Sequence, residues 1–185
     1  MAMRQRPSML AVGTIEPRKG QTQLLDAMER LWAKGIDVNL VLVGKNGWKV
    51  ETLVKRLRSH PELNHRLYWL EGISDEYLEK VYGSCSCLVA ASLGEGFGLP
   101  LIEAAQKKLP ILARDLPVFR EVAGNFASYF HGTDPADLSQ AIETWLNRFA
   151  SGEHVHSEGM HWLTWKESAE ALKALLPLTD PFPKN

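Results

Sequence analysis

The sequence predicts an α/β domain with a parallel sheet of about six strands and helices on both faces. Short apolar runs alternate with amphipathic segments through the first 150 residues. The segments between them are short, as in right-handed strand–helix–strand crossovers. The loops that carry glycine and charged residues follow the apolar runs, so they should gather at one edge of the sheet, where open α/β sheets bind ligands.

The six predicted strands are short and mostly apolar, which is typical of strands buried on both faces. They are residues 9–13, 38–44, 66–70, 88–91, 110–113 and 127–130.

The predicted helices follow the strands and show apolar residues at helical spacing. Leu24, Leu25, Met28, Leu31 and Trp32 mark the first helix. Further helices are expected near 50–57, after the N-cap Ser74, at 101–107, within 114–124 and at 135–149.

The chain divides near residue 150. Residues 7–150 form the predicted α/β domain, and residues 151–185 read as a linker followed by a terminal helix around Trp165 and Leu172. The histidines His154, His156 and His161 have no carboxylate or cysteine at a spacing suited to metal binding, so no metal is expected there.

Composition limits the function. The chain has 185 residues and a net charge of −1, which favours neither nucleic-acid nor membrane binding by bulk electrostatics. The sequence shows no secretory signal or membrane-spanning run. Its two cysteines, Cys85 and Cys87, lie in an apolar run and suit a reducing cytoplasm. We therefore expect a cytoplasmic location.

Residues 92–103 (SLGEGFGLPLIE) are the most informative stretch. Glycines at 94, 96 and 98 allow the backbone to turn tightly and approach a ligand closely. Pro100 suits the start of a helix, and a helix N-terminus favours an anion such as phosphate. Glu95 and Glu103 flank the loop, and Glu103 can reach back from the helix. These residues alone also fit an ordinary strand-to-helix turn with two solvated glutamates.

A phosphorylated ligand near two carboxylates needs positive charge. The sequence contains no Asp-x-Asp pair for a divalent metal. Arg18 and Lys19 follow the first predicted strand and supply two positive charges at the same edge, with Lys45 as a weaker candidate. The prediction is a site without metal or cofactor, in which fixed cations stabilise a departing diphosphate.

Five motifs in order resemble those of the GT4 group of retaining GT-B glycosyltransferases. The Glu-x7-Glu spacing of Glu95 and Glu103 is similar to that of the group. The motifs are residues 12–20 (VGTIEPRKG), 42–48 (LVGKNGW), 72–78 (GISDEYL), 95–100 (EGFGLP) and 121–124 (EVAG). The resemblance covers residues 8–173 and is to the C-terminal, Rossmann-like donor-binding domain alone, which is one half of a GT-B fold.

The resemblance implies roles for individual residues. Arg18 and Lys19 would hold the donor diphosphate, Glu103 the ribose hydroxyls, and Glu95 the transferred sugar. Glu95, Arg18 and Lys19 are then the expected catalytic residues. In the family the residue at the position of Glu95 has been discussed as a nucleophile, and a front-face mechanism without a covalent intermediate is the commoner view. The other expected substrate-binding residues are Gly96, Phe97, Gly98, Leu99, Gly13, Thr14, Gly44, Lys45, Gly72 and Ile73. Many relatives have Arg in place of Thr14.

The implied function is metal-independent, retaining transfer of a hexose, with mannose as one candidate, from a nucleoside-diphosphate sugar to a glycan or lipid-linked acceptor. Bacterial polysaccharide or lipopolysaccharide synthesis is the expected pathway. The acceptor would be bound by an N-terminal domain that these residues do not include, so we expect the fragment to be inactive alone. The full-length enzyme would associate peripherally with the inner face of the membrane. The alternatives are a non-catalytic nucleotide-binding module and a related GT-B sugar-nucleotide epimerase.

Overall fold

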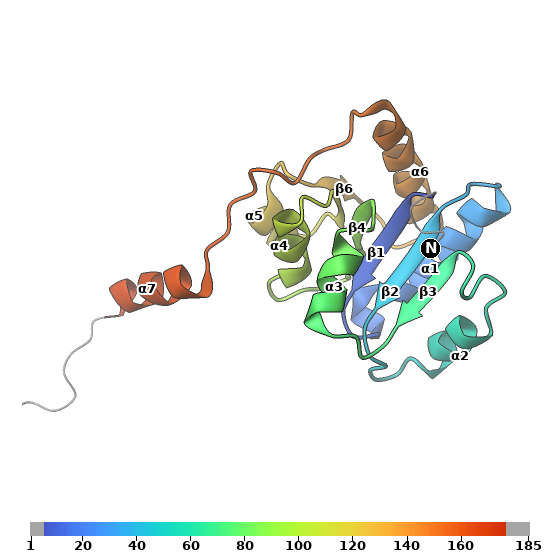
Figure 1. The fold of residues 1–185 in the computed structure, drawn as a ribbon, viewed down its shortest axis with the longest axis horizontal. Helices are drawn as coiled ribbons and strands as arrows, with labels where there is room; N and C mark the ends of the chain where they lie inside the picture. Colours follow the sequence, from blue (N-terminus) through green and yellow to red (C-terminus); the bar gives the residue numbers. More distant parts are fainter. Residues whose placement is uncertain (1–5, 177–185) are drawn as a thin grey trace, which may run out of the picture.

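The computed structural model describes residues 6–176 and contains one six-stranded sheet in which all paired strands are parallel (Figure 1). The strand order is β3-β2-β1-β4-β5-β6. The strands are β1 (Ser8–Val12), β2 (Asn39–Val43), β3 (Leu67–Leu70), β4 (Cys87–Ala90), β5 (Ile111–Arg114) and β6 (Ser128–Phe130). The predicted fold class and all six predicted strands are confirmed.

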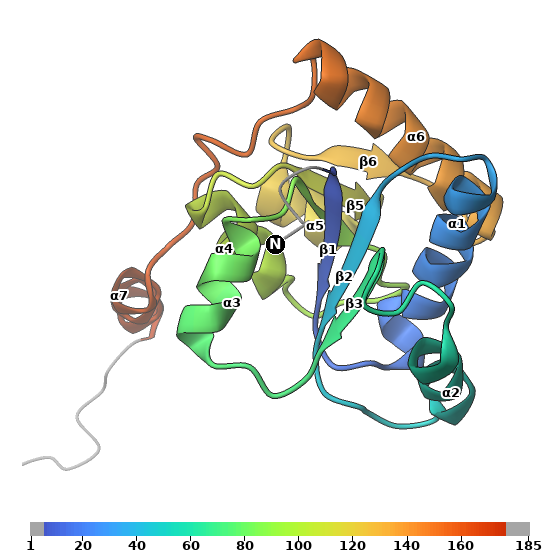
Figure 2. The same ribbon diagram turned by 45° about the vertical axis from the view of Figure 1, so that its right-hand side comes forward.

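Helices cover both faces of the sheet, as predicted. The helices are α1 (Gln21–Ala33), α2 (Glu51–Ser59), α3 (Asp75–Tyr82), α4 (Leu99–Gln106), α5 (Pro117–Ala123), α6 (Pro135–Ser151) and α7 (Trp165–Leu175), with a short 3-10 turn η2 (Pro17–Lys19) before α1. Figure 2 shows α1, α2 and α6 on one face, and α3, α4 and α5 on the other.

Alternation along the strands divides the core into two layers. Met9 and Leu40 pack under α1 and α2, whereas their neighbours Leu10 and Val41 pack under α3 and α4. All four side chains are fully buried. Because successive residues of a strand point to opposite faces, two apolar helix layers require strands that are apolar throughout.

One helix start differs from the prediction. Pro100 was expected to open the helix and to keep Leu99 out of it, but α4 begins at Leu99. Gly98 is the N-cap, and its φ of 88° is in the left-handed region that glycine adopts without strain. The turn is therefore completed at Gly98, and Pro100 occupies the first helical turn, where its missing N–H removes no helical hydrogen bond.

The terminal helix forms where it was expected. Thr164 and Glu167 make a reciprocal capping box at the start of α7. Figure 1 shows α7 standing away from the sheet, and none of its residues is buried. Residues 177–185 of the predicted C-terminal segment lie outside the described part of the chain. Within residues 6–176, no helix has both the length and the apolarity needed to cross a membrane.

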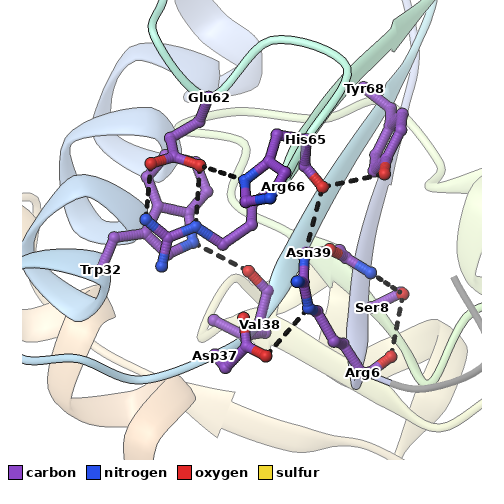
Figure 3. A network of polar contacts seen from close by, with 10 residues as sticks. All are labelled: Arg6, Ser8, Trp32, Asp37, Val38, Asn39, Glu62, His65, Arg66 and Tyr68. Atoms are coloured by element: carbon purple, nitrogen blue, oxygen red, sulfur yellow. Dashed lines mark hydrogen bonds and ion pairs between the residues drawn. The ribbon is translucent and has the colours of Figure 1, made fainter. Parts of the chain in front are cut away.

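The amino ends of the strands carry a polar network, drawn in Figure 3. Arg66 donates two hydrogen bonds to Glu62, at 2.5 and 2.8 Å, and its guanidinium lies over the Trp32 ring. Arg6 pairs with Asp37 at 2.8 Å. We call the ten residues of Figure 3 the amino-edge network: Arg6, Ser8, Trp32, Asp37, Val38, Asn39, Glu62, His65, Arg66 and Tyr68.

Candidate donor-binding site

The candidate site lies where the strand order reverses. β1 pairs with β2 on one side and β4 on the other, so the loops that follow β1 and β4 meet beyond their carboxyl ends. The Leu93 N–H donates to the Arg18 carbonyl at 2.7 Å and joins the two loops. A Cβ on Gly20 would collide with the Ala91 carbonyl, so this close approach requires glycine.

Four charged side chains come together on these loops. Lys19 Nζ lies 2.5 Å from Glu95 Oε2, and Arg18 Nη1 lies 3.6 Å from Glu95 Oε1. Arg18 also donates to Glu16 at 2.9 Å. We call Glu16, Arg18, Lys19 and Glu95 the carboxyl-edge cluster. The expected cations are therefore beside Glu95, and without a ligand they are already paired with carboxylates.

The Glu95 carboxyl is held in its charged form. Burial raises its pKa, but the hydrogen bond and charge of Lys19, with smaller contributions from the Gly96 N–H and Arg18, outweigh burial and leave the pKa below its ordinary value. The Glu95 side chain is only 12% exposed. Loss of Lys19 would leave a largely buried carboxylate with Arg18 as its remaining cation.

The loop between β4 and α4 carries Gly94, Gly96 and Gly98, and we call it the glycine loop. It borders open space. A Cβ at Gly94 or Gly96 would meet no atom within 4 Å, so the protein's own packing does not require glycine there. Gly98 differs, because a Cβ there would lie 2.9 Å from the Phe119 ring. In the described part of the chain, the backbone N–H groups of residues 97–99 have no hydrogen-bond acceptor. These N–H groups can bind phosphate or sugar oxygens.

The two expected carboxylates occupy separate surroundings. Glu95 lines a small pocket with Lys19, Gly98 and Pro100, whereas Glu103 is not among the residues of that pocket. The carboxylate of Glu103 instead accepts a hydrogen bond from the Tyr82 hydroxyl at 2.6 Å. Glu103 is half-buried on α4, and Tyr82 is buried at the end of α3.

Glycines also join the loops after β1 and β2. The Gly13 N–H donates to the Val43 carbonyl, and the Ile15 N–H donates to the Lys45 carbonyl, both at 2.9 Å. A Cβ on Gly44 would collide with the Gly13 carbonyl. Gly44 is thus needed for close backbone packing, and the φ of 139° favours glycine at position 13, whether or not either residue contacts a ligand.

The remaining predicted site residues lie at the same edge. The side chains of Thr14 and Lys45 are exposed, and no hydrogen bond or ion pair among residues 6–176 joins them to the carboxyl-edge cluster. Gly72 is exposed with a φ of 63°, and Ile73 is partly buried against the α3–α4 layer. Phe97 and Leu99 are exposed on the glycine loop.

Sequence reasoning missed Arg114, which supports the glycine loop from below. The predicted strand ends at residue 113, but Arg114 is the last residue of β5 and only 6% exposed. Its guanidinium donates to the carbonyls of Ala91 and Ser92, and also to Gly132 and Gln23. Burial lowers the pKa of Arg114 and Asp137 raises it, with burial dominant. The only sequence signal was a charged residue directly after an apolar strand.

Two glutamines at the start of α1 were also missed. Gln21 is 5% exposed and donates to the Thr14 carbonyl at 3.0 Å, which fixes the loop after β1. Gln23 accepts from Arg114 and donates to the Asp134 carbonyl at 2.8 Å. Polar residues in the first turn of an otherwise apolar helix face were the available signal. In the region that the structure describes, no group of three or more His, Cys, Asp or Glu side chains is placed to hold a metal ion.

Comparison with known proteins decides the family. The family model described as glycosyl transferases group 1 matches residues 3–157. The chain belongs to this family. The resemblance stated from the five motifs is confirmed at this level, and the match spans both loops of the carboxyl-edge cluster.

Curated relatives of the chain are named mannosyltransferases. The serotype-specific mannosyltransferase WbdA of Escherichia coli is 53% identical over 184 residues, which is 100% of this chain and 23% of the relative. The O-antigen chain mannosyltransferase RfbU of Salmonella typhimurium is 28% identical over 72% of this chain and 37% of the relative. The chain thus spans about a quarter of the length of WbdA.

Solved structures share the fold. Anabaena HepE in complex with UDP-glucose has a TM-score of 0.70 at 20% identity, over 83% of this chain and 43% of that one. The C-terminal domain of the group 1 glycosyl transferase LpcC from Francisella tularensis has a TM-score of 0.68 at 18% identity, over 82% of each chain. The chain is therefore folded like one domain of these larger enzymes.

Proposed function

We propose that this chain is the donor-binding domain of a retaining hexosyltransferase that uses a nucleoside-diphosphate sugar without a metal ion. The observation that carries the proposal is the carboxyl-edge cluster on the same pair of loops as the N–H groups of residues 97–99, which have no acceptor among residues 6–176. Two cations and the N-terminus of α4 lie there, beyond the carboxyl ends of β1 and β4, where the strand order reverses. Mannose is the favoured hexose because the curated relatives are named mannosyltransferases.

The pairing within the cluster indicates how the donor would bind. Glu95 neutralises Lys19 and Arg18 in the free protein, so a diphosphate must take these cations over. Glu95 is then released toward the sugar, whose hydroxyls can donate to a carboxylate. The cations and the N–H groups are fixed in advance, and they stabilise the charge that develops on the diphosphate as the sugar–phosphate bond breaks.

A second domain would supply the acceptor. The helix α7 exposes apolar side chains, with Trp165 83%, Leu172 58% and Leu175 81% exposed. Such a face usually packs against another surface. We assign it to an N-terminal acceptor domain of the same polypeptide, which would bind a glycan or lipid-linked acceptor. We place the full-length enzyme in the cytoplasm, at the inner face of the membrane, and the relatives named O-antigen chain mannosyltransferases support a role in polysaccharide synthesis.

Calorimetric titration of the chain with GDP, UDP and ADP, each with and without its sugar, tests the donor site. The variants are Arg18→Ala and Glu103→Ala, with Lys34→Ala as a control. Lys34 forms an ion pair with Glu143 at 2.6 Å, after the last residue of α1. We expect one nucleotide series to bind, both site variants to weaken it by about tenfold or more, and the control and EDTA to have no effect.

Two results would contradict the proposal. If neither site variant weakens binding, the assigned site is wrong. If the chain alone transfers a hexose to an acceptor at a rate typical of a complete enzyme, the division into donor and acceptor domains is wrong.

A further inference from the structure

Among the described residues, the buried Tyr82 hydroxyl is the one polar group of another helix that forms a hydrogen bond with the Glu103 side chain. Tyr82 is the last residue of α3, and its hydroxyl donates to Glu103 Oε2 at 2.6 Å. The tyrosine is 2% exposed and belongs to the apolar layer with Leu88 and Leu101. Its ring is therefore held by packing, and the direction of its hydroxyl is fixed with it.

The hydrogen bond persists over the pH range in which proteins work. Burial raises the pKa of Tyr82, and the Glu103 carboxylate raises it further, so the phenol stays protonated and remains a donor. A hydroxyl cannot be buried without cost unless it finds an acceptor, and Glu103 is that acceptor. The pair is thus a fixed feature of the fold, independent of any ligand.

The contact uses one oxygen of the carboxylate and leaves the other available. Among residues 6–176, no hydrogen bond is made to Glu103 Oε1. A glutamate in the first turns of a helix has several rotamers, and anchoring one oxygen removes most of that freedom. A carboxylate held in this way can accept from the neighbouring hydroxyls of a ribose without first losing side-chain entropy.

We propose that Tyr82 is a positioning residue that fixes the Glu103 carboxylate for the ribose hydroxyls of the donor nucleotide. This inference rests on the proposed function, in which Glu103 binds the ribose. Tyr82 does not touch the donor, so its contribution depends on the presence of the hydroxyls that Glu103 binds. A purely structural tyrosine would affect all nucleotides alike.

A second contact between the same two segments provides a control. Lys107, which follows α4, lies 3.1 Å from Glu79 of α3, and this pair is exposed. An exposed ion pair contributes little to stability or orientation. The variant Lys107→Met removes this ion pair and leaves Glu103 unchanged. It therefore shows whether any loss of an α3–α4 contact affects nucleotide binding, or only the loss of the contact that orients the Glu103 carboxylate.

The test uses Tyr82→Phe, which removes only the hydroxyl. Its matched control is Tyr68→Phe, because Tyr68 donates to the His65 carbonyl at the amino edge of the sheet (Figure 3). Calorimetry measures the binding of whichever of GDP, UDP and ADP binds most tightly, and of the 2′,3′-dideoxy form of that nucleotide. Thermal unfolding of each variant monitors the fold.

We expect Tyr82→Phe to weaken the ribonucleotide by about fivefold to tenfold, the equivalent of one hydrogen bond. Binding of the dideoxynucleotide should stay within about twofold of wild type, as should both nucleotides in Tyr68→Phe and Lys107→Met. In a Glu103→Ala background, Tyr82→Phe should have no further effect on the preference for ribose, because the two residues act as one unit.

Four outcomes overturn the inference. In the first, Tyr82→Phe binds both nucleotides as wild type does, and in the second it weakens the binding of both equally. If Glu103→Ala still removes the preference for ribose in either case, Tyr82 does not position the carboxylate and the proposed function stands. If Glu103→Ala also keeps the preference, Glu103 is not the ribose ligand. If wild type binds no nucleoside diphosphate, the proposed function fails and the inference fails with it.

Discussion

The two ends of the sheet both carry clusters of opposite charge, yet they are built differently. In the amino-edge network, Arg66 and Glu62 form a two-point ion pair, the Arg66 guanidinium covers Trp32, and the indole N–H of Trp32 donates to the Val38 carbonyl at 2.8 Å (Figure 3). Both arginines of the network pair with a carboxylate of the network, whereas the buried Asn39 Oδ1 has no hydrogen-bond partner among the described residues. The network connects the amino ends of β1, β2 and β3.

The carboxyl-edge cluster also pairs its two cations with two carboxylates, and Arg18 donates to Glu16 at 2.9 Å. Glu95 accepts from Lys19 at 2.5 Å, while Arg18 approaches it only to 3.6 Å. The space above Gly94 and Gly96 is open, and the N–H groups of residues 97–99 have no acceptor among the described residues. Dense ion pairing therefore does not distinguish a binding site from a structural network, whereas free donors beside open space do.

Removal of Lys19 should have the largest effect and should act on binding. In Lys19→Met, we expect nucleoside diphosphate to bind about 100-fold more weakly, because a charge-assisted hydrogen bond to phosphate contributes roughly 1.5–3 kcal/mol. The control is Lys34→Met, which breaks the exposed Lys34–Glu143 pair and should leave binding unchanged. Calorimetry at constant ionic strength measures both. Equal loss in the two variants would mean that net charge, not position, determines binding.

Removal of the Arg114 side chain should mainly lower the free energy of unfolding. In Arg114→Met, the carbonyls of Ala91 and Ser92 lose a buried donor. We expect the free energy of unfolding to fall by about 2 kcal/mol, which lowers Tm by roughly 4–8 °C in a domain of this size. Differential scanning fluorimetry measures the shift.

The matched control for Arg114 is Arg120→Met. Arg120 makes a two-point ion pair with Asp115 at 2.7 and 2.8 Å, but the pair is exposed, so the expected change is small. If Arg114→Met unfolds at the wild-type temperature, the glycine loop does not depend on the buried guanidinium, and the carboxyl edge is less rigid than its contacts indicate.

Much of the fold could be predicted because it depends on local patterns. Apolar runs and helical spacing locate all six strands, and the parallel sheet follows from their alternation with helices. The strand order does not follow from these patterns, since it depends on which strands pack side by side. The Lys19–Glu95 pair illustrates the same limit, because each residue was identified but their contact spans 76 positions.

Residues that support the site were missed for a related reason. Tyr82 lies on the apolar face of α3, but its hydroxyl meets Glu103 only because α3 and α4 lie on the same face of the sheet. Arg114 lies just beyond the predicted strand 110–113, and its role was missed because its partners are distant in the sequence. Its acceptors come from the loop after β4, the loop after β6 and α1, which no local pattern brings together.

Substitution of Glu62, in the amino-edge network, should lower stability without changing nucleotide binding. The hydrogen bond from Arg66 outweighs burial and lowers the pKa of Glu62 from the ordinary 4.5 of a glutamate to about 2. A lowered pKa stabilises the fold above the unfolded value, and this contribution is lost as the pH falls from about 4.5 toward 2. In Glu62→Gln, we expect a loss of about 1–2 kcal/mol at pH 7, allowing for solvent screening, that shrinks below pH 4.

Urea unfolding between pH 7 and pH 2.5 measures this loss, and nucleotide binding at pH 7 should be unchanged. The control Glu71→Gln removes a longer, exposed contact to Arg58 at 3.8 Å and should have little effect. Weaker nucleotide binding in Glu62→Gln would show that the two edges are coupled through the sheet.

Two glycines of the glycine loop show the same difference between a structural role and a binding role. Gly98 has a φ of 88° and the Phe119 ring 2.9 Å from the position of a Cβ, whereas a Cβ on Gly96 would meet nothing within 4 Å. We expect Gly98→Ala to lower the free energy of unfolding by about 1 kcal/mol. Gly96→Ala should leave stability within about 0.5 kcal/mol of wild type and weaken nucleotide or sugar-nucleotide binding by about threefold. Urea unfolding and calorimetry on both variants distinguish the two roles. Equal stability losses would mean that the space above Gly96 is needed by the loop itself, and the case for a ligand there would then rest on the carboxyl-edge cluster alone.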